Sequence, residues 1–111
     1  MTLDDDRPPL AQTRFKLRNV RKSVIVLKLE PWGETHSVAP GAEIELIARG
    51  PSGDALEVQW GRSEVTVYGW PGSVVRLVRR GEMLDLHRLP APYVPPGMRT
   101  REWLEAYAAL A

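Results

Sequence analysis

The sequence has no cysteine, only two histidines and no long run of hydrophobic residues. Without cysteine there is no disulfide, no thiol nucleophile and no cysteine-ligated zinc or iron–sulfur centre, so packing alone must stabilise the fold. Without an apolar stretch of about 20 residues, no membrane-spanning helix is expected. The N-terminus carries Asp4, Asp5 and Asp6 and does not look like a secretory signal. We therefore expect a cytoplasmic protein without a membrane partner.

Net charge is nearly absent as well. Fifteen basic and 14 acidic side chains give a formal charge of +1, which provides no general attraction to nucleic acid. The two signs are nevertheless separated along the chain. Every charged residue from Arg7 to Lys28 is basic, whereas the segment from Glu30 to Glu64 holds seven acids and two arginines. We expect these two segments to attract each other within the fold.

The chain has 111 residues, a size typical of one domain, and it is rich in turn-forming residues, with ten prolines and nine glycines. Turn signals recur about every ten residues, a spacing typical of short antiparallel strands. They fall at Pro31–Gly33, Pro40–Gly41, Pro51–Gly53, Gly61, Pro71–Gly72 and Gly81. Two of them, Pro40–Gly41 and Pro71–Gly72, fit type II turns, because proline presets the first central residue and glycine accepts positive φ at the second.

Between the turns, apolar and polar side chains alternate with period two, as expected for strands with one buried face. The segment from Ser23 to Glu30 is apolar on both faces except for Lys28, which indicates a central strand. We therefore predict a mainly β protein, an antiparallel β-sandwich or small barrel of about seven or eight short strands in meander or Greek-key order. The predicted inward residues are Phe15, Leu17, Ile44, Leu46, Ala48, Leu56, Val58, Trp60, Val65, Val67, Val75, Leu77, Leu84 and Leu86.

The predicted organisation is an N-terminal tail (1–12), a β domain (13–89), a proline-rich linker (90–99) running over the surface, and a C-terminal helix (100–111) capped by Thr100. On that helix Trp103, Tyr107 and Leu110 lie at positions i, i+4 and i+7 and form one apolar stripe. A helix of about three turns is marginal alone in water. The stripe must pack either on the protein's own sheet or on a second copy, as a homodimer contact.

Three turn motifs stand out: Leu29–Glu34 (LEPWGE), Pro40–Gly41, and Gly69–Ser73 (GWPGS). In this combination the chain resembles small uncharacterised bacterial all-β proteins. The resemblance implies a bacterial β protein and brings no activity or cofactor with it.

Trp32 and Trp70 both fall at predicted turns, where a sandwich or barrel has its ends. Two exposed indoles beside Glu34 and His36 could stack on a sugar ring or grip a partner peptide. Alternatively, each tryptophan folds over the end of the core and closes it, in keeping with the general burial of large aromatics.

The segment from Gly33 to Gly50 has a faint similarity to the first motif of cupins. His36, Glu43 and Gly50 fit that motif, but Val38 stands where the second histidine belongs. The resemblance implies a barrel with a metal held by His36 and Glu43, and two ligands do not make a dependable octahedral site. We expect no metal and no cofactor.

Other chemistry is weakly supported. Asp85 and His87 could join a serine in a triad, but no spacing selects one, and no glycine-rich phosphate loop precedes a helix. The basic segment Arg14–Lys22 could contact nucleic acid. Pairing of Lys16 and Arg18 with Glu43, Glu45 or Glu57 would use the same charges, and we favour it.

The sequence therefore predicts a non-catalytic binding or protein-interaction module, with Trp32, Glu34, His36 and Trp70 as the binding residues. A cupin-like barrel for a small molecule or metal is the first alternative, and weak nucleic-acid binding through the basic N-terminal strand is the second.

Overall fold

The computed structural model describes residues 9–84, 90–92 and 97–110, the last four by their backbone alone. Asp85, Leu86 and His87 lie outside the described residues. Along the described chain the elements are β1 (Leu10–Arg18), β2 (Ile25–Glu30), β3 (Glu34–Val38), β4 (Glu43–Pro51), β5 (Glu57–Trp60), β6 (Glu64–Tyr68), β7 (Val74–Arg79), β8 (Glu82–Met83) and α1 (Thr100–Leu110). The predicted mainly β protein with one C-terminal helix is confirmed.

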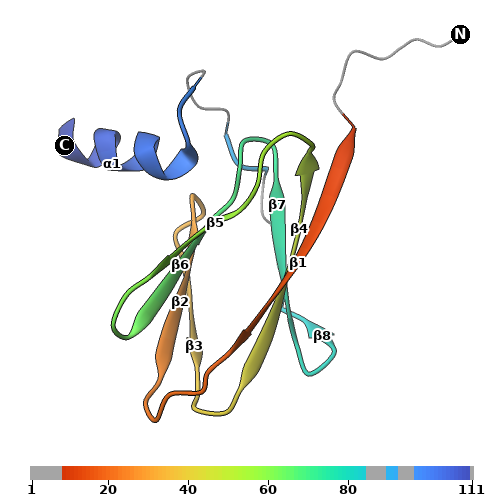
Figure 1. The fold of residues 1–111 in the computed structure, drawn as a ribbon, viewed down its shortest axis with the longest axis vertical. Coiled ribbons are helices and arrows are strands. Elements are labelled where there is room, and N and C mark those ends of the chain that lie inside the picture. Colours follow the sequence, from red (N-terminus) through yellow and green to blue (C-terminus); the bar gives the residue numbers. More distant parts are fainter. Residues whose placement is uncertain (1–8, 85–89, 93–96, 111) are drawn as a thin grey trace, which may run out of the picture.

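The strands form two four-stranded sheets. Sheet A has the order β1-β4-β7-β8 and sheet B the order β3-β2-β6-β5. No described strand belongs to both sheets, so of the two predicted architectures the fold is the sandwich. Figure 1 shows the sheets as two layers, with α1 beyond the end at which β1 begins and β2, β4 and β6 finish. This end is called the α1 end below.

The two inner faces make one apolar core. Sheet A contributes Leu17, Ile44, Leu46, Ala48, Val75 and Leu77, and sheet B contributes Ile25, Leu27, Leu29, Val38, Val65 and Val67. Each of these residues is at most 2% exposed, and burial of one such side chain stabilises the fold by about 1.5 to 3 kcal/mol. The alternation in the sequence therefore predicted correctly the inward residues of β1, β4, β6 and β7, whereas it indicated apolar residues on both faces of β2 and assigned no inward residue to β3.

The charge pairing expected between β1 and β4 is also present. Their antiparallel register sets Lys16 opposite Glu45 and Arg18 opposite Glu43, and Arg14 Nη1 lies 3.5 Å from Glu45 Oε2. In sheet B, Lys28 Nζ lies 3.0 Å from Glu64 Oε2. Opposite charges on neighbouring strands contribute about 0.2 to 1 kcal/mol each.

Both predicted type II turns form. Ala42 N donates to Ala39 O and Ser73 N donates to Trp70 O, each at 2.9 Å. The glycine of each turn has positive φ, 81° at Gly41 and 82° at Gly72. The second of these turns connects β6 to β7 and shapes the α1 end of the sandwich.

The expectation that all strands run antiparallel is wrong for one pair: β2 and β6 are parallel, with Val26 opposite Glu64 and Glu30 opposite Tyr68. The chain crosses to sheet A with β4 and returns with β5 before β6 enters beside β2. Both β2 and β6 therefore run toward the α1 end. In addition, β1 begins at Leu10, inside the segment predicted as the tail.

Trp60 corrects a second prediction. Its alternation with Val58 suggested a core position, but the indole is 53% exposed. Trp60 lies opposite Val65, so it is on the inward face, yet it ends β5, an edge strand of sheet B. The guanidinium of Arg21 lies over its ring, 5.8 Å from the centroid, in a cation–π contact. The pattern was right about the face and wrong about whether the other sheet covers it.

Among the described residues, no helix is long and apolar enough to cross a membrane.

Candidate functional site

The two turn tryptophans lie at the same end of the sandwich, in different environments. Trp70 is 3% exposed, and its Nε1–H donates to the carbonyl of Pro51 at 2.8 Å. Trp32 is half-buried and packs against the core, with its ring close to Gly69. Trp70 thus closes the end of the core, as in the second sequence interpretation, and its indole does not offer a binding surface.

Glu34 and His36 form a pair of their own on β3. They stand opposite Leu29 and Leu27 of β2, which places them on the inward face of an edge strand, and both are half-buried. His36 Nε2 lies 3.2 Å from Glu34 Oε1. Neither residue lines the pocket described below. The sequence prediction therefore grouped two residues that do contact each other, but they do not share a site with Trp70.

The structure separates the two residues of the cupin-like motif. Glu43 lies on the exposed outer face of sheet A, opposite Arg18, whereas His36 faces inward from sheet B. Within the described residues, no group of three or more His, Asp or Glu side chains could hold a metal ion.

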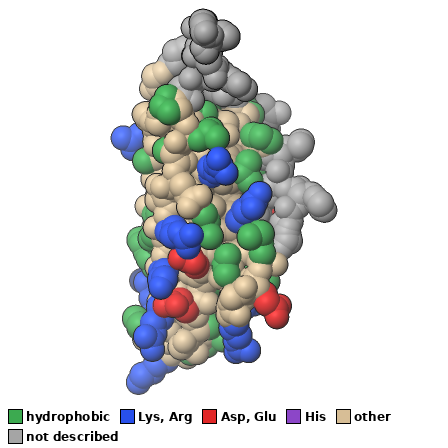
Figure 2. All heavy atoms as spheres, turned by 90° about the vertical axis from the view of Figure 1, so that its right-hand side faces the viewer, with side chains coloured by type: hydrophobic (Ala, Val, Ile, Leu, Met, Phe, Trp, Pro, Cys, Tyr) green, Lys and Arg blue, Asp and Glu red, His purple; other side chains and the backbone are tan. Residues whose placement is uncertain are grey.

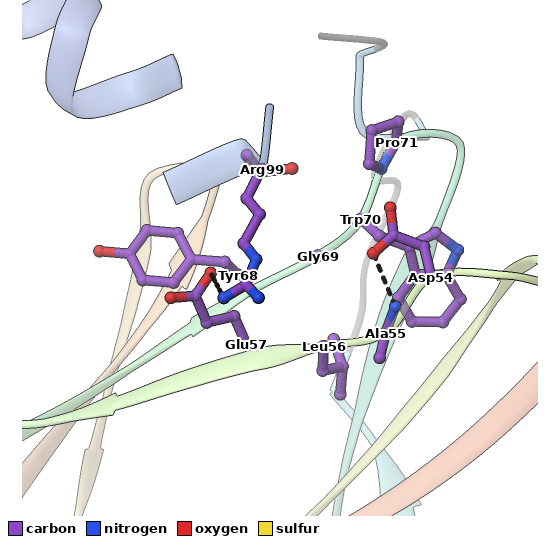
Figure 3. A pocket seen from close by; sticks show the side chains of 10 residues that line it. Asp54, Ala55, Leu56, Glu57, Tyr68, Gly69, Trp70, Pro71 and Arg99 are labelled. Atoms are coloured by element: carbon purple, nitrogen blue, oxygen red, sulfur yellow. Dashed lines mark hydrogen bonds and ion pairs between the residues drawn. The ribbon is translucent and has the colours of Figure 1, made fainter. Parts of the chain in front are cut away.

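A pocket of about 200 Å³ opens at the α1 end. Three segments far apart in the sequence form it: the start of β5 with the loop before it, the β6–β7 turn, and the start of α1. Figure 3 shows Glu57, Tyr68 and Arg99 on one side of the pocket, Asp54, Trp70 and Pro71 on the other, and Leu56 and Gly69 between them.

The linker after the β domain is what brings α1 to this pocket. Ala91 N donates to Ser73 O and Gly72 N donates to Ala91 O, both at 2.8 Å, and Ala91 is 2% exposed. The prediction that the proline-rich linker runs over the surface is therefore wrong at this position. Prolines lack N–H groups, and among the described residues of the linker it is Ala91, between Pro90 and Pro92, that bonds to the β6–β7 turn.

The start of α1 also differs from expectation. Trp103 N donates to Arg99 O and Arg99 N donates to Glu102 Oε1, both at 2.9 Å, so Arg99 is the N-cap residue and Glu102 supplies one half of a capping box. Thr100, predicted as the cap, is the first residue of the helix and is 4% exposed. Its hydroxyl is buried and has no hydrogen-bond partner.

Glu57 links α1 to sheet B. Arg101 Nε donates to Glu57 Oε2, and this hydrogen bond is the main reason that the pKa of Arg101 is raised. Arg99 Nη1 lies 4.0 Å from Glu57 Oε1, an oxygen that is buried without a hydrogen-bond partner. Arg101 also contacts Glu105 on the next turn of the helix. Charge pairs with Glu57 therefore hold the start of α1 on sheet B, although one Glu57 oxygen has no hydrogen bond.

Tyr68 forms one wall of the pocket, and its hydroxyl donates to Gln59 Oε1 at 3.1 Å. Burial raises the pKa of Tyr68, and the carboxylates of Glu105 and Glu30 raise it further, so the phenol remains protonated at neutral pH. No histidine, cysteine or serine is among the residues that line the pocket. The pocket can hold a ligand by shape, charge and hydrogen bonds, and its charged and hydroxyl-bearing lining residues are Asp54, Glu57, Arg99, Tyr68 and Thr100.

The apolar stripe predicted on α1 is only partly described. Trp103 is half-buried, while the side chains of Tyr107 and Leu110 lie outside the described residues.

Gly69 makes the floor of the pocket possible. A methyl group at this position would lie 2.6 Å from Cη2 of Trp32 and 2.7 Å from Oγ of Ser73. We expect Gly69→Ala to lower the free energy of unfolding by about 1 to 3 kcal/mol through overpacking, measured by urea denaturation. The matched control is Gly61→Ala, because its methyl group would approach the flexible Glu64 side chain at 3.2 Å and the Glu64 carbonyl oxygen at 3.5 Å, an ordinary van der Waals contact. Equal losses in the two variants would contradict the close packing of Trp32 on Gly69.

Comparison of the chain with protein-family models, with curated proteins and with solved structures finds no match. The fold and the pocket are therefore the basis for a functional proposal.

Proposed function

We propose that the protein is a non-catalytic interaction module that binds a short peptide segment of a partner in the pocket at the α1 end. The observation that carries the proposal is the placing of opposite charges across an apolar floor. The carboxylate of Asp54 stands on one side, the guanidinium of Arg99 on the other, and Leu56 lies between them (Figure 3).

A peptide segment matches this arrangement because its N–H donors and C=O acceptors follow each other closely, beside an apolar side chain. The N–H groups suit Asp54, and the carbonyl groups suit Arg99, whose side chain is 70% exposed and only loosely paired with Glu57. Tyr68 and Pro71 add an aromatic ring and a rigid apolar wall. Aromatic and arginine side chains are the residues most often found to dominate protein interfaces.

The lining also favours binding over catalysis. The hydroxyl of Tyr68 already donates to Gln59, and the hydroxyl of Thr100 is buried at the foot of α1. The charge pairs of Glu57 seat the start of α1 beside the pocket, so that Arg99 faces the bound segment.

The test is selection of peptides from a displayed random library on the immobilised full chain, followed by calorimetry with the enriched peptide. We expect Arg99→Ala and Asp54→Asn each to weaken binding by about tenfold or more, which corresponds to about 1.4 kcal/mol. Arg62→Ala is the matched control, because Arg62 is also exposed and does not line the pocket. Failure to enrich any peptide would reject the proposal. Binding of the enriched peptide by Arg99→Ala and Asp54→Asn as tight as by the wild type would reject it too.

A further inference from the structure

The longest edge strand of the described sheets is β1. It has nine residues and pairs only with β4, so its other side has no neighbouring strand in the part of the chain that the structure describes. The hydrogen bonds at its two ends show which residues of β1 point their backbone groups toward β4. Ser52 N donates to Pro9 O at 2.7 Å and Asn19 N donates to Ala42 O at 2.9 Å.

In an antiparallel pair, alternate residues bond to the partner strand and the residues between them point their N–H and C=O groups to the opposite side. Because residues 9 and 19 bond toward β4, the odd-numbered residues of β1 share this orientation. The even-numbered residues present their backbone groups at the free edge. These residues are Leu10, Gln12, Arg14, Lys16 and Arg18.

The same residues carry their side chains on the exposed outer face of sheet A. A cavity of about 470 Å³ hollows this face near the α1 end, and its lining includes Arg14, Ile47, Arg49, Val74 and Arg76. Figure 2 shows this side of the molecule, where lysine and arginine side chains lie among hydrophobic ones. The free backbone edge of β1 is therefore continuous with a surface that is both basic and apolar.

Near the cavity Arg14 pairs with Glu45, but two further arginines are not neutralised across the strands. Farther from the α1 end, Lys16 and Arg18 stand opposite Glu45 and Glu43. Arg49, in contrast, stands between Gln12 and Val74, and Arg76 stands opposite Ile47. Within the described residues, neither Arg49 nor Arg76 forms an ion pair, so this half of the face can accept carboxylates.

We propose that the free edge of β1 and the adjoining basic face dock an extended acidic segment of a partner protein, which adds a fifth strand to sheet A. The backbone groups of the even-numbered residues supply the ladder bonds, as in other complexes formed by strand addition. The added strand sets every second side chain beside the basic row of β1. Carboxylates at those positions are attracted by the positive charge of Arg14, Arg49 and Arg76, and the residues between them fall on the inner face of the sheet, beside Phe15.

The charges disfavour the other occupants. If the whole of β1 paired antiparallel with β1 of a second copy about a two-fold axis, Arg14 at its centre would stand opposite Arg14, and like charges directly opposite are destabilising. A nucleic acid would bring phosphates toward Glu43 and Glu45 on the same face, and it would leave the free backbone groups of β1 without a strand partner. An acidic protein segment satisfies both the charge and the backbone edge.

The test uses the ¹⁵N-labelled full chain and an N-acetylated peptide that alternates glutamate with valine, with a lysine–valine peptide as the matched probe. Binding is measured at about 10 mM salt, where the Debye length is about 30 Å and charges are only weakly screened. We expect the acidic peptide to slow amide hydrogen exchange at Gln12, Arg14 and Lys16, while the amides of Thr13 and Phe15 are protected with and without it. The lysine–valine peptide is expected to leave all these amides unchanged.

Two kinds of variant separate the backbone and charge contributions. Gln12→Pro removes a donor at the free edge without removing a bond to β4, so the chain is expected to fold and to bind the acidic peptide at least about tenfold more weakly. Arg49→Glu and Arg76→Glu are expected to weaken binding by about tenfold each, whereas Lys22→Glu, in the β1–β2 loop, leaves it unchanged.

Four results would overturn the inference: equal binding of the lysine–valine peptide, no effect of Gln12→Pro, retention of a DNA or RNA oligonucleotide in place of the acidic peptide, or self-association lost on Gln12→Pro. The inference and the proposed function fail separately, because Gln12→Pro leaves the pocket at the α1 end intact and Arg99→Ala leaves β1 intact.

Discussion

Trp70→Ala is expected to lower the free energy of unfolding by about 3 to 5 kcal/mol, as is usual when a buried large aromatic residue is truncated. Its indole is 3% exposed, closes the α1 end of the core, and donates its N–H to Pro51 O. Trp70→Phe keeps an aromatic ring and removes that hydrogen bond, so a smaller loss of about 1 to 3 kcal/mol is expected. Guanidinium denaturation followed by far-ultraviolet circular dichroism measures both.

Trp60→Ala is the matched control for this experiment. Trp60 is 53% exposed and contacts the guanidinium of Arg21, so its truncation is expected to cost about 1 kcal/mol or less. If Trp70→Ala were no more destabilising than Trp60→Ala, Trp70 would not be the residue that closes the core. The sequence-based hypothesis that its indole binds a partner would then be favoured again.

Asn19→Ala is expected to lower the free energy of unfolding by roughly 2 to 4 kcal/mol, because it leaves two backbone carbonyls and one backbone N–H without their hydrogen-bond partner. Asn19 is fully buried between β1 and β2. Its Nδ2 donates to the carbonyls of Ser23 and Val38, each at 2.9 Å, and its Oδ1 accepts from the backbone N–H of Arg21 at 2.9 Å. One side chain thus fixes the loop between β1 and β2 and ties it to the end of β3.

Asn19→Asp tests the role of the two donors more sharply, since it keeps the shape and replaces the amide nitrogen by an oxygen that faces two carbonyls. This environment raises the pKa of the new carboxyl above its ordinary value of about 3.9. The folded state then holds the proton more tightly than the unfolded chain. The deficit in stability relative to the wild type is therefore largest at neutral pH and shrinks as the pH falls toward about 4.

Gln59→Ala serves as the control for both Asn19 variants. Gln59 is an exposed amide that accepts one bond from Tyr68, so its loss is expected to cost about 1 kcal/mol or less. A pH-independent deficit in Asn19→Asp, or a loss in Asn19→Ala no larger than that of Gln59→Ala, would contradict the described hydrogen bonds.

The candidate site was less accessible to sequence reasoning than these structural residues. Thr100 followed by a helical pattern was a reasonable cap, but the N–H of Arg99, three positions before Glu102, is the one that the Glu102 carboxylate accepts from. The capping-box pattern requires Ser, Thr, Asp or Asn at the cap, so the sequence holds no signal for Arg99. The spacing of Arg101 and Glu105, in contrast, signals an i,i+4 ion pair. No local signal links either arginine to Glu57, which lies 44 residues before Arg101.

The alternation of apolar and charged residues by itself determined that the protein is built from short strands and which face of most of them is buried, because a period of two is a local property of an extended chain. The separation of basic and acidic residues along the chain likewise predicted the charge pairing between β1 and β4. Only the tertiary structure decided which inward residues the opposite sheet covers, so that Trp70 is buried and Trp60 is exposed. It alone decided that β2 and β6 run parallel and that Asp54, Tyr68 and Arg99 meet in one pocket, since such contacts depend on how distant segments pack and leave no trace in local spacing.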